Sequence, residues 1–253
     1  MNLIGTYTLA KKESWRFIGV WTQTLLSPII SNLLFLLVFG AIMVGRPSPI
    51  EGVTYLTFLI PGLAVLGFIT NAFMNPSSSL VLEKYTGVIQ GLLMIPLSGF
   101  GLTLGYVFPA LLRGVIVAVV TIVVGAFFTP ILFAHVWMIV LSTLLLGLLF
   151  GSIGVIVGIL SDTFDQMSAI SSFVIQPLIY LGGVFYSIRL LPAPFDVISQ
   201  FNPMLYVIDF FRYGFLGTGD VPLALSFWIT CGLTFISFCI AWRLFATGYK
   251  LKT

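Results

Sequence analysis

The sequence predicts an all-α membrane protein that crosses the bilayer with six helices, and three observations support this fold class. The 253-residue chain is 59% hydrophobic and only 8% charged. Its mean hydropathy is +1.14. Soluble domains carry about 25% charged residues. The few charged residues of this chain could therefore not cover a water-facing surface. Uncharged runs of spanning length, each about 20 residues, fill nearly the whole chain and leave no room for a soluble domain.

Charged residues and a proline mark the ends of the predicted spans. Arg16 and Arg46 flank the first uncharged run, and the run from Arg113 to Asp162 is too long for one helix. That long run breaks near Pro130, because proline cannot continue helical hydrogen bonding. We therefore predict spans over residues 21–44, 54–75, 99–126, 135–159, 166–186 and 222–245.

Lysine and arginine predict the orientation, since cytoplasmic loops of membrane proteins carry an excess of both. Six crossings put both termini on one side, and basic residues are more numerous on that side. We therefore predict cytoplasmic termini and interpret the net charge of +3 as a topology signal, with no nucleic-acid partner. The predicted cytoplasmic residues are Lys11, Lys12, Arg16, Lys84, Arg243, Lys250 and Lys252, against Arg46, Arg189 and Arg212 on the other side.

Residues 7–17 precede the first span and mix charged with apolar side chains. Lys11 and Arg16 alternate with Leu9 and Trp15 in this segment. The pattern is typical of an amphipathic helix that lies in the membrane interface. A frayed terminus is the alternative.

Residues 83–95 follow the second span and carry a helical pattern of their own. Val88, Ile89 and Leu92 recur at helical spacing, and Pro96 ends the pattern. We predict a short cytoplasmic helix against the membrane, and an interfacial loop is the alternative.

Residues 187–220 connect the last two spans and are too apolar and aromatic for a solvated loop. Pro192, Pro194 and Pro203 divide the segment into pieces too short to span. We predict a helix pair that enters the outer leaflet and returns. The pair should pack against the rest of the protein, because non-helical backbone inside a bilayer is tolerated only where protein or a cavity surrounds it. An ordinary extracellular cap on the bundle is the alternative.

Residue patterns for catalysis are lacking in the sequence. No phosphate-binding glycine loop and no set of metal ligands at a usable spacing occurs, and the single histidine, His135, is expected at a helix end. We therefore expect neither an enzyme nor a cofactor bound by this chain.

Arg113 is the one ionisable residue well inside a predicted span, roughly fourteen residues into the third. A charge at the bilayer centre costs about 2.5–3.5 kcal/mol, so such residues are candidates for function. We expect Arg113 to pair with Asp209 or to face an anionic ligand, with snorkelling to the outer headgroups as the alternative. Acidic residues, which ion-coupled carriers place near the midplane, lie instead at the inner end of the fourth span, as Asp162 and Asp165.

An ordered set of short motifs resembles the ABC-2-type permeases, the transmembrane subunits of bacterial ATP-binding-cassette exporters. Within that family the chain looks most like the subgroup of nodulation-factor exporter permeases and uncharacterised inner-membrane permeases. The motifs are VWTQTL at 20–25, FLIPG at 58–62, EKYTG at 83–87 leading to IPLS at 95–98, SDTFDQ at 161–166, GGVFYS at 182–187, Leu191-Pro192 and NPMLY at 202–206 with Asp209, Arg212 and Tyr213.

The resemblance implies the partners and the location. It implies one transmembrane domain over residues 1–253, a second copy of the chain, and two copies of a separate ATP-binding subunit that bind the ATP and Mg²⁺. It also implies a bacterial inner membrane and an exported drug or amphipathic or lipid-linked substrate. Two other functions are left open: an ATP-independent carrier or channel, and a membrane scaffold that transports nothing.

The resemblance also implies roles for individual residues. The helix at 83–95 would be the coupling helix that receives motion from the ATP-binding subunit, with Glu83 and Lys84 as the foremost polar contacts. The residues expected to touch the ATP-binding subunit are Glu83, Lys84, Tyr85, Gly87 and Gln90. The candidates for the pathway and the outer hairpin are Arg113, Asn202, Tyr206, Asp209 and Arg212.

Overall fold

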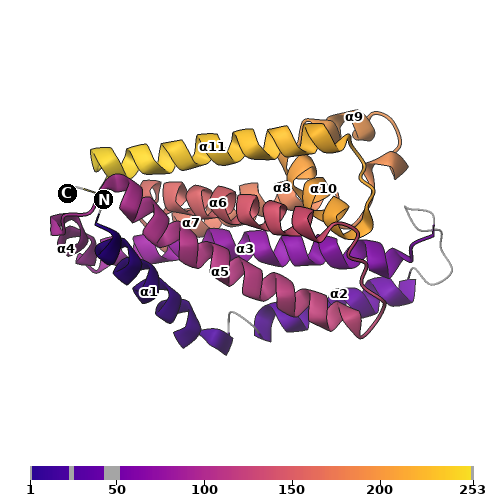
Figure 1. Ribbon diagram of the computed structural model, residues 1–253, viewed down its shortest axis with the longest axis horizontal. Helices are drawn as coiled ribbons and strands as arrows, with labels where there is room; N and C mark the ends of the chain where they lie inside the picture. Colours follow the sequence, from indigo (N-terminus) through magenta and orange to yellow (C-terminus); the bar gives the residue numbers. More distant parts are fainter. Residues whose placement is uncertain (1, 23–25, 43–51, 252–253) are drawn as a thin grey trace.

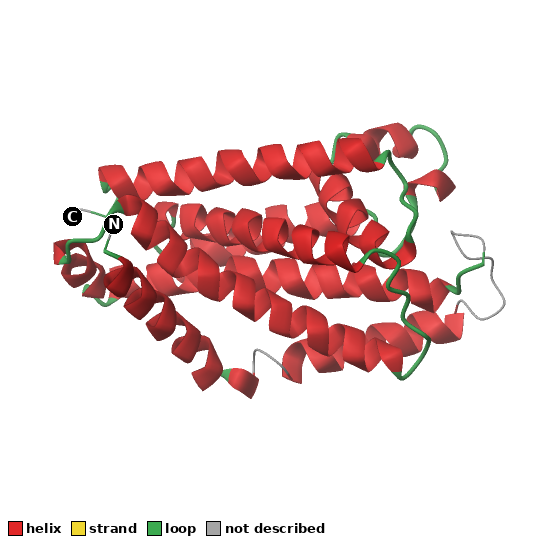
Figure 2. Cartoon of the chain, viewed as in Figure 1, coloured by secondary structure: helices red, strands yellow, loops and turns green. Residues whose placement is uncertain are grey.

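The computed structural model describes residues 2–22, 26–42 and 52–251, and within these residues it is helical without a β-strand (Figure 2). The all-α prediction is therefore confirmed. The elements in order are α1 Leu3–Gly19, α2 Ser27–Ile42, α3 Tyr55–Tyr85, α4 Val88–Met94, α5 Gly99–Ala126, α6 Val136–Leu160, α7 Phe164–Ile170, the π-turn η2 Ser171–Ile175, α8 Gln176–Leu181, the short η3 Ile188–Leu190, α9 Phe195–Gln200, α10 Pro203–Leu216 and α11 Leu223–Thr247.

Helix α3 forms the centre of the bundle. In its most apolar stretch 72% of residues are buried, against 22% for α11. Helices α5 and α6 pack along α3, whereas α11 lies along α5 and α6 at the edge of the molecule (Figure 1). An apolar helix that the protein leaves this exposed is suited to contact with lipid.

Close packing between α6 and α3 depends on glycine. A Cβ atom on Gly154 would lie 2.4 Å from the carbonyl oxygen of Phe73, and one on Gly158 would lie 3.0 Å from Cα of Ser77. Small residues let membrane helices approach closely, since dispersion contacts rather than hydrophobic exclusion hold them together in lipid.

Four of the described helices, α3, α5, α6 and α11, are long and apolar enough to span a membrane. The remaining two predicted spans correspond to α2, of which 16 residues are described, and to the helix from α7 to α8, which η2 interrupts. Residues 23–25 and 43–44 of the first predicted span lie outside the described residues. The count of six crossings stays a prediction.

Helix α3 extends beyond the predicted span of 54–75. It runs for 31 residues, or about 46 Å at 1.5 Å per residue. It continues through Pro76, as helices packed among other helices in a membrane can. The helix is therefore longer than the hydrocarbon layer of a bilayer, which is about 30 Å thick.

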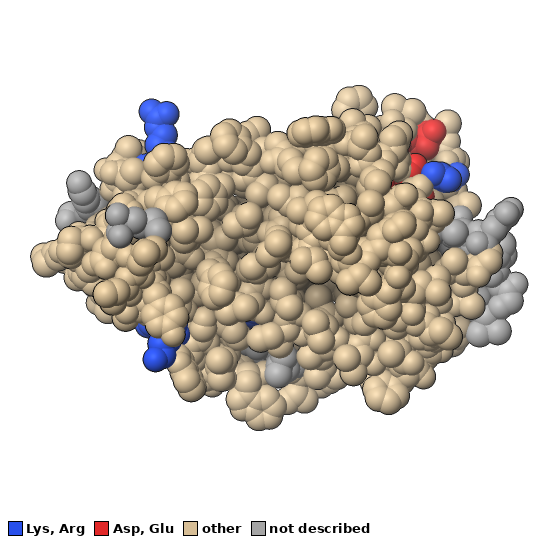
Figure 3. Space-filling view, viewed as in Figure 1, with Lys and Arg blue, Asp and Glu red and all other residues tan. Residues whose placement is uncertain are grey.

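Both chain ends and α4 lie at one end of the bundle, and α9 and α10 lie toward the other (Figure 1). We call these the termini end and the hairpin end. On the face shown in Figure 3, charged side chains gather near the two ends and a broad band between them has almost none. Such a band is what a bilayer would cover.

Candidate functional site

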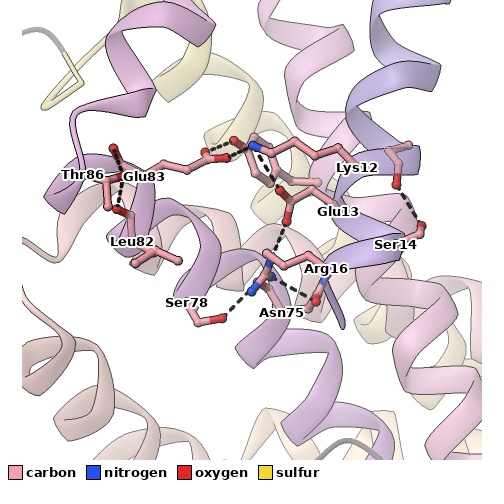
Figure 4. Close-up of polar contacts among 11 residues, drawn as sticks. Lys12, Glu13, Ser14, Arg16, Asn75, Ser78, Leu82, Glu83 and Thr86 are labelled. Carbon is pink, nitrogen blue, oxygen red and sulfur yellow. Dashed lines mark hydrogen bonds and ion pairs between the residues drawn. The ribbon is translucent and has the colours of Figure 1, made fainter. Parts of the chain in front are cut away.

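Six side chains near the termini end form a network that we call the α1–α3 cluster. It joins Lys12, Glu13 and Arg16 of α1 to Asn75 and Glu83 of α3 and to Tyr106 of α5 (Figure 4).

The Glu83 carboxylate accepts hydrogen bonds from two side chains of this cluster. Lys12 Nζ lies 2.5 Å from Glu83 Oε1, and the Tyr106 hydroxyl donates to Glu83 Oε2. Tyr106 is fully buried and the Glu83 side chain is only 7% exposed. A carboxylate this buried is retained only when charge and hydrogen bonds compensate its lost hydration, as Lys12 and Tyr106 do here.

Arg16 makes the second link of the cluster. Its Nε lies 3.0 Å from Glu13 Oε2, and its Nη2 lies 2.6 Å from the carbonyl oxygen of Asn75. Glu13 is fully buried. Charged side chains thus attach α1 to α3 at two positions, Asn75 and Glu83. The predicted segment 7–17 is therefore part of a longer helix, Leu3–Gly19, and the alternative of a frayed terminus is wrong.

Lys84, the neighbour of Glu83, attaches α3 to a different helix. Its Nζ lies 2.9 Å from the carbonyl oxygen of Ile159 and 2.6 Å from that of Ser161, at the C-terminus of α6. It also lies 3.2 Å from Asp162 Oδ1, and this hydrogen bond holds the pKa of the Asp162 carboxyl below its ordinary value. A cation placed on the last carbonyls of α6 complements the dipole of that helix.

The segment after Lys84 turns back sharply into α4. Gly87 has φ +73°, a conformation that glycine adopts without steric cost, and it separates α3 from the seven residues of α4. Ile89 is buried against the bundle, whereas Tyr85 is 82% exposed and Met94 is 84% exposed. The result is a short helix, anchored on one face and open on the other.

The single helix predicted over 83–95 is therefore wrong in its extent. Glu83 to Tyr85 form the last turn of α3, and α4 covers only Val88–Met94. The carboxylate of Glu83 and the ammonium group of Lys84, the foremost predicted contacts with a partner subunit, are both engaged within the chain. The surface left open comprises Tyr85, Gly87 and Gln90 among the expected contacts. Contact with a partner stays a prediction for all five.

A polar cavity of about 360 Å³ lies farther along the bundle, bounded by α2, α3 and α8. It adjoins a more apolar groove of about 310 Å³ on α2 that shares Ser31 and Phe35 with it. Side chains with hydroxyl or amide groups contribute much of the cavity wall. They are Ser27, Ser31, Asn32, Thr70, Asn71, Gln176 and Tyr180.

Arg113 contacts this cavity wall instead of the hairpin end. Its Nε lies 3.1 Å from Oδ1 of Asn71, a residue near the middle of α3. The expected pair with Asp209 is wrong, because the Asp209 carboxylate accepts from the backbone N–H of Asp220 at 2.7 Å and from the Ser226 hydroxyl at 3.2 Å. The guanidinium is therefore held at mid-helix, where snorkelling would not place it.

The other hairpin candidates hold helices together. The Asn202 side chain caps α10 at Met204 N and donates to the carbonyl oxygen of Leu178 at 2.7 Å. The Tyr206 hydroxyl donates to the Gln200 carbonyl oxygen at 2.8 Å. Arg212 is buried. It donates to the carbonyl oxygens of Gly183 and Val184 and lies 4.0 Å from the ring centre of Phe58. A part in a transport pathway stays a prediction for these residues.

Sequence reasoning did not identify the α1–α3 cluster as a site. Glu13 and Arg16 are three residues apart, a spacing that suggests an ion pair on one helix. On α3, Arg16 contacts the backbone carbonyl oxygen and the side-chain amide oxygen of Asn75, and neither atom gives a signal in a single sequence. Gln176 and Asn71 of the cavity were also missed, since isolated amides within apolar runs do not interrupt them.

Comparison with known proteins agrees with these features. A model of the ABC-2 type transporter family matches residues 5–216. The chain is 37% identical over 253 residues to the inner membrane transport permease YadH of Escherichia coli K12, covering 98% of each chain. It is 26% identical over 245 residues to nodulation protein J of Rhizobium leguminosarum bv. viciae, covering 88% of each chain. It is 25% identical over 255 residues to nodulation protein J of Rhizobium meliloti, covering 92% of this chain and 93% of that protein.

Proposed function

Since this chain belongs to the ABC-2 type transporter family, we propose that it is the permease subunit of an ATP-driven exporter in a bacterial inner membrane. Membership of the family, the name of its relative and the apolar helices support a membrane transport permease. The family also implies an ATP-binding partner, which would hydrolyse the ATP. Export, the cargo and the number of subunits are proposals.

The observation that carries the proposal is the attachment of the last turn of α3. Glu83 joins this turn to α1 and Lys84 joins it to α6, and the exposed helix α4 follows directly. A force applied to α4 would therefore reach three helices of the bundle through buried or charge-assisted contacts. We propose that α4 and the turn at Gly87 form the coupling surface for the ATP-binding subunit, with Tyr85 and Gln90 at its rim.

The cavity bounded by α2, α3 and α8 supplies the proposed pathway. Its hydroxyl and amide groups can bind a polar head, and the adjoining groove beside Phe35 and Phe39 can hold an apolar chain. An amphipathic or lipid-linked cargo has both parts. In this proposal two copies of the chain face each other across the pathway, with two ATP-binding subunits below and the termini in the cytoplasm.

Site-directed crosslinking tests the coupling surface. Cys231 and Cys239 are replaced by serine, and Gln90→Cys is co-expressed with the candidate ATP-binding subunit and treated with a short bifunctional crosslinker. The matched control is Phe201→Cys, a position 84% exposed near the hairpin end. We expect a crosslink to the ATP-binding subunit from position 90 and none from position 201. A preparation that exports yet never crosslinks from position 90 would contradict the proposal.

A further inference from the structure

A groove between α1 and α5 lies apart from the polar cavity and is not lined by α4. It has a volume of about 490 Å³, within the range of small-molecule sites in proteins. The wall is mostly apolar, with Leu104 and Phe108 contributed by α5. From α1 it receives Leu3, Thr6, Tyr7, Ala10, Lys11, Ser14, Trp15 and Ile18.

Helix α1 exposes apolar side chains although its opposite face is packed. Leu9 and Phe17 are buried against the bundle. On the open face Tyr7 is 67% exposed and Trp15 is 64% exposed. Aromatic rings with one polar atom favour the level of lipid headgroups. The open face of α1 and the groove beside it are therefore suited to lipid.

Lys11 supplies the charge at this groove. The neighbouring cations of α1 are neutralised within the protein, Lys12 by Glu83 and Arg16 by Glu13. The Lys11 side chain is exposed and makes no ion pair or hydrogen bond with any residue in the described ranges. Tyr7 lies four residues before Lys11 and Trp15 four residues after it, so the three share one helix face. A compact anion could bind there to an ammonium group and a phenol.

We propose that this groove binds one anionic glycerophospholipid. The phosphate would bind Lys11 and the Tyr7 hydroxyl, and one acyl chain would lie in the groove along Leu104 and Phe108. The excess positive charge selects an anionic headgroup over a zwitterionic one. Placing the lipid in the inner leaflet depends on the proposed orientation, but binding itself does not depend on the proposed function.

Fluorescence quenching by brominated lipids tests this proposal on the full chain in vesicles. Trp15 is kept and the other four tryptophans, Trp21, Trp137, Trp228 and Trp242, are replaced by phenylalanine, with circular dichroism as the check on folding. The vesicles contain phosphatidylcholine with a small fraction of either brominated phosphatidylglycerol or brominated phosphatidylcholine. We expect the lipid site beside Trp15 to bind the anionic lipid with an apparent affinity about fivefold higher than that for the zwitterionic lipid. One basic residue near a membrane surface provides about this preference.

Substitution of Lys11 separates a bound lipid from a general attraction to the surface. Lys11→Gln should abolish the fivefold preference, and Lys11→Arg should retain it. The matched control is Arg243→Gln, which removes an exposed cation of α11 that lines none of the described cavities. This control should leave the preference unchanged.

Three results would overturn the proposal. Equal quenching by both lipids would show that no anionic site exists at Trp15. Equal loss of preference in Lys11→Gln and Arg243→Gln would show general attraction. Absence of quenching by either lipid would show that protein, such as a second copy of this chain, covers the groove.

Discussion

At the scale of the residue, Glu83 shows how strongly burial changes the interpretation of a charged side chain. A glutamate and a lysine next to each other beyond a predicted span suggest a hydrated, partner-facing surface. The structure instead directs Glu83 toward Lys12 and Tyr106, and Lys84 toward the end of α6. The difference arises because α3 continues ten residues past the predicted end of its span, which brings both side chains against neighbouring helices.

Replacement of Glu83 by alanine should destabilise the protein. The fully buried Tyr106 hydroxyl would lose its acceptor, which costs about 1–3 kcal/mol, whereas Lys12 can turn to water. Thermal unfolding of the purified chain in detergent should show the loss. The double variant Glu83→Ala with Tyr106→Phe should recover part of it, and a double variant no more stable than Glu83→Ala would contradict this assignment.

Replacement of Arg113 by leucine should impair transport while leaving the amount of protein in the membrane unchanged. Arg113 is the cation behind Asn71 at the proposed pathway, and leucine preserves the apolar part of the side chain. Transport in cells and the membrane level by immunoblot are measured together. The control is Arg243→Leu on the exposed face of α11. Normal transport by Arg113→Leu would exclude a functional role.

At the scale of the element, hydropathy predicted where most helices lie and missed how they are attached. The predicted span at 99–126 coincides with α5, and the predicted span at 135–159 agrees with α6 within one residue at each end. Both agree because a long uncharged run is itself the main signal for a helix that crosses a bilayer. The predicted span at 54–75 is shorter than α3, which continues through Pro76 to Tyr85. The contacts of Arg16 with Asn75 and of Arg212 with Gly183 could not be predicted, since backbone carbonyls are present at every residue.

The contact between α6 and α3 predicts a large effect of one methyl group. Gly154→Ala would place Cβ 2.4 Å from the Phe73 carbonyl oxygen, so the helices must separate. Overpacking of this kind costs about 1–3 kcal/mol. Gly232→Ala on α11 is the control, because its Cβ would meet nothing within 4 Å. Unfolding temperatures in detergent should fall for Gly154→Ala only, and equal temperatures for the two variants would refute the packing.

The turn before α4 predicts a loss of coupling without a loss of folding. Gly87→Pro cannot adopt φ +73° and would redirect α4, while the contacts of Glu83 and Lys84 keep α3 in place. We expect transport in cells to fall strongly at an unchanged membrane level. Gly232→Ala on α11, where a Cβ meets nothing, is the control. A scaffold that transports nothing would be unaffected by either change.

At the scale of the whole molecule, nearly all described residues belong to the helical bundle, and α4 is its small exposed projection at the termini end (Figure 1). The bundle contains a polar cavity beside α2, and contacts of Glu83 and Lys84 link the last turn of α3, which precedes α4, to α1 and α6. These features suit a permease driven from outside itself. We therefore expect the pathway to open and close only when an ATP-binding subunit acts on α4.

Accessibility of Ser31, which borders both the cavity and its adjoining groove, tests this claim without knowledge of the cargo. Ser31→Cys, in a chain whose Cys231 and Cys239 are serine, is reconstituted in vesicles with or without the ATP-binding subunit and labelled with an impermeant maleimide. We expect ATP with vanadate to change the labelling rate only when the subunit is present and Gly87 is intact. The same rate with and without ATP in the complete complex, or an ATP effect on the chain alone, would contradict it.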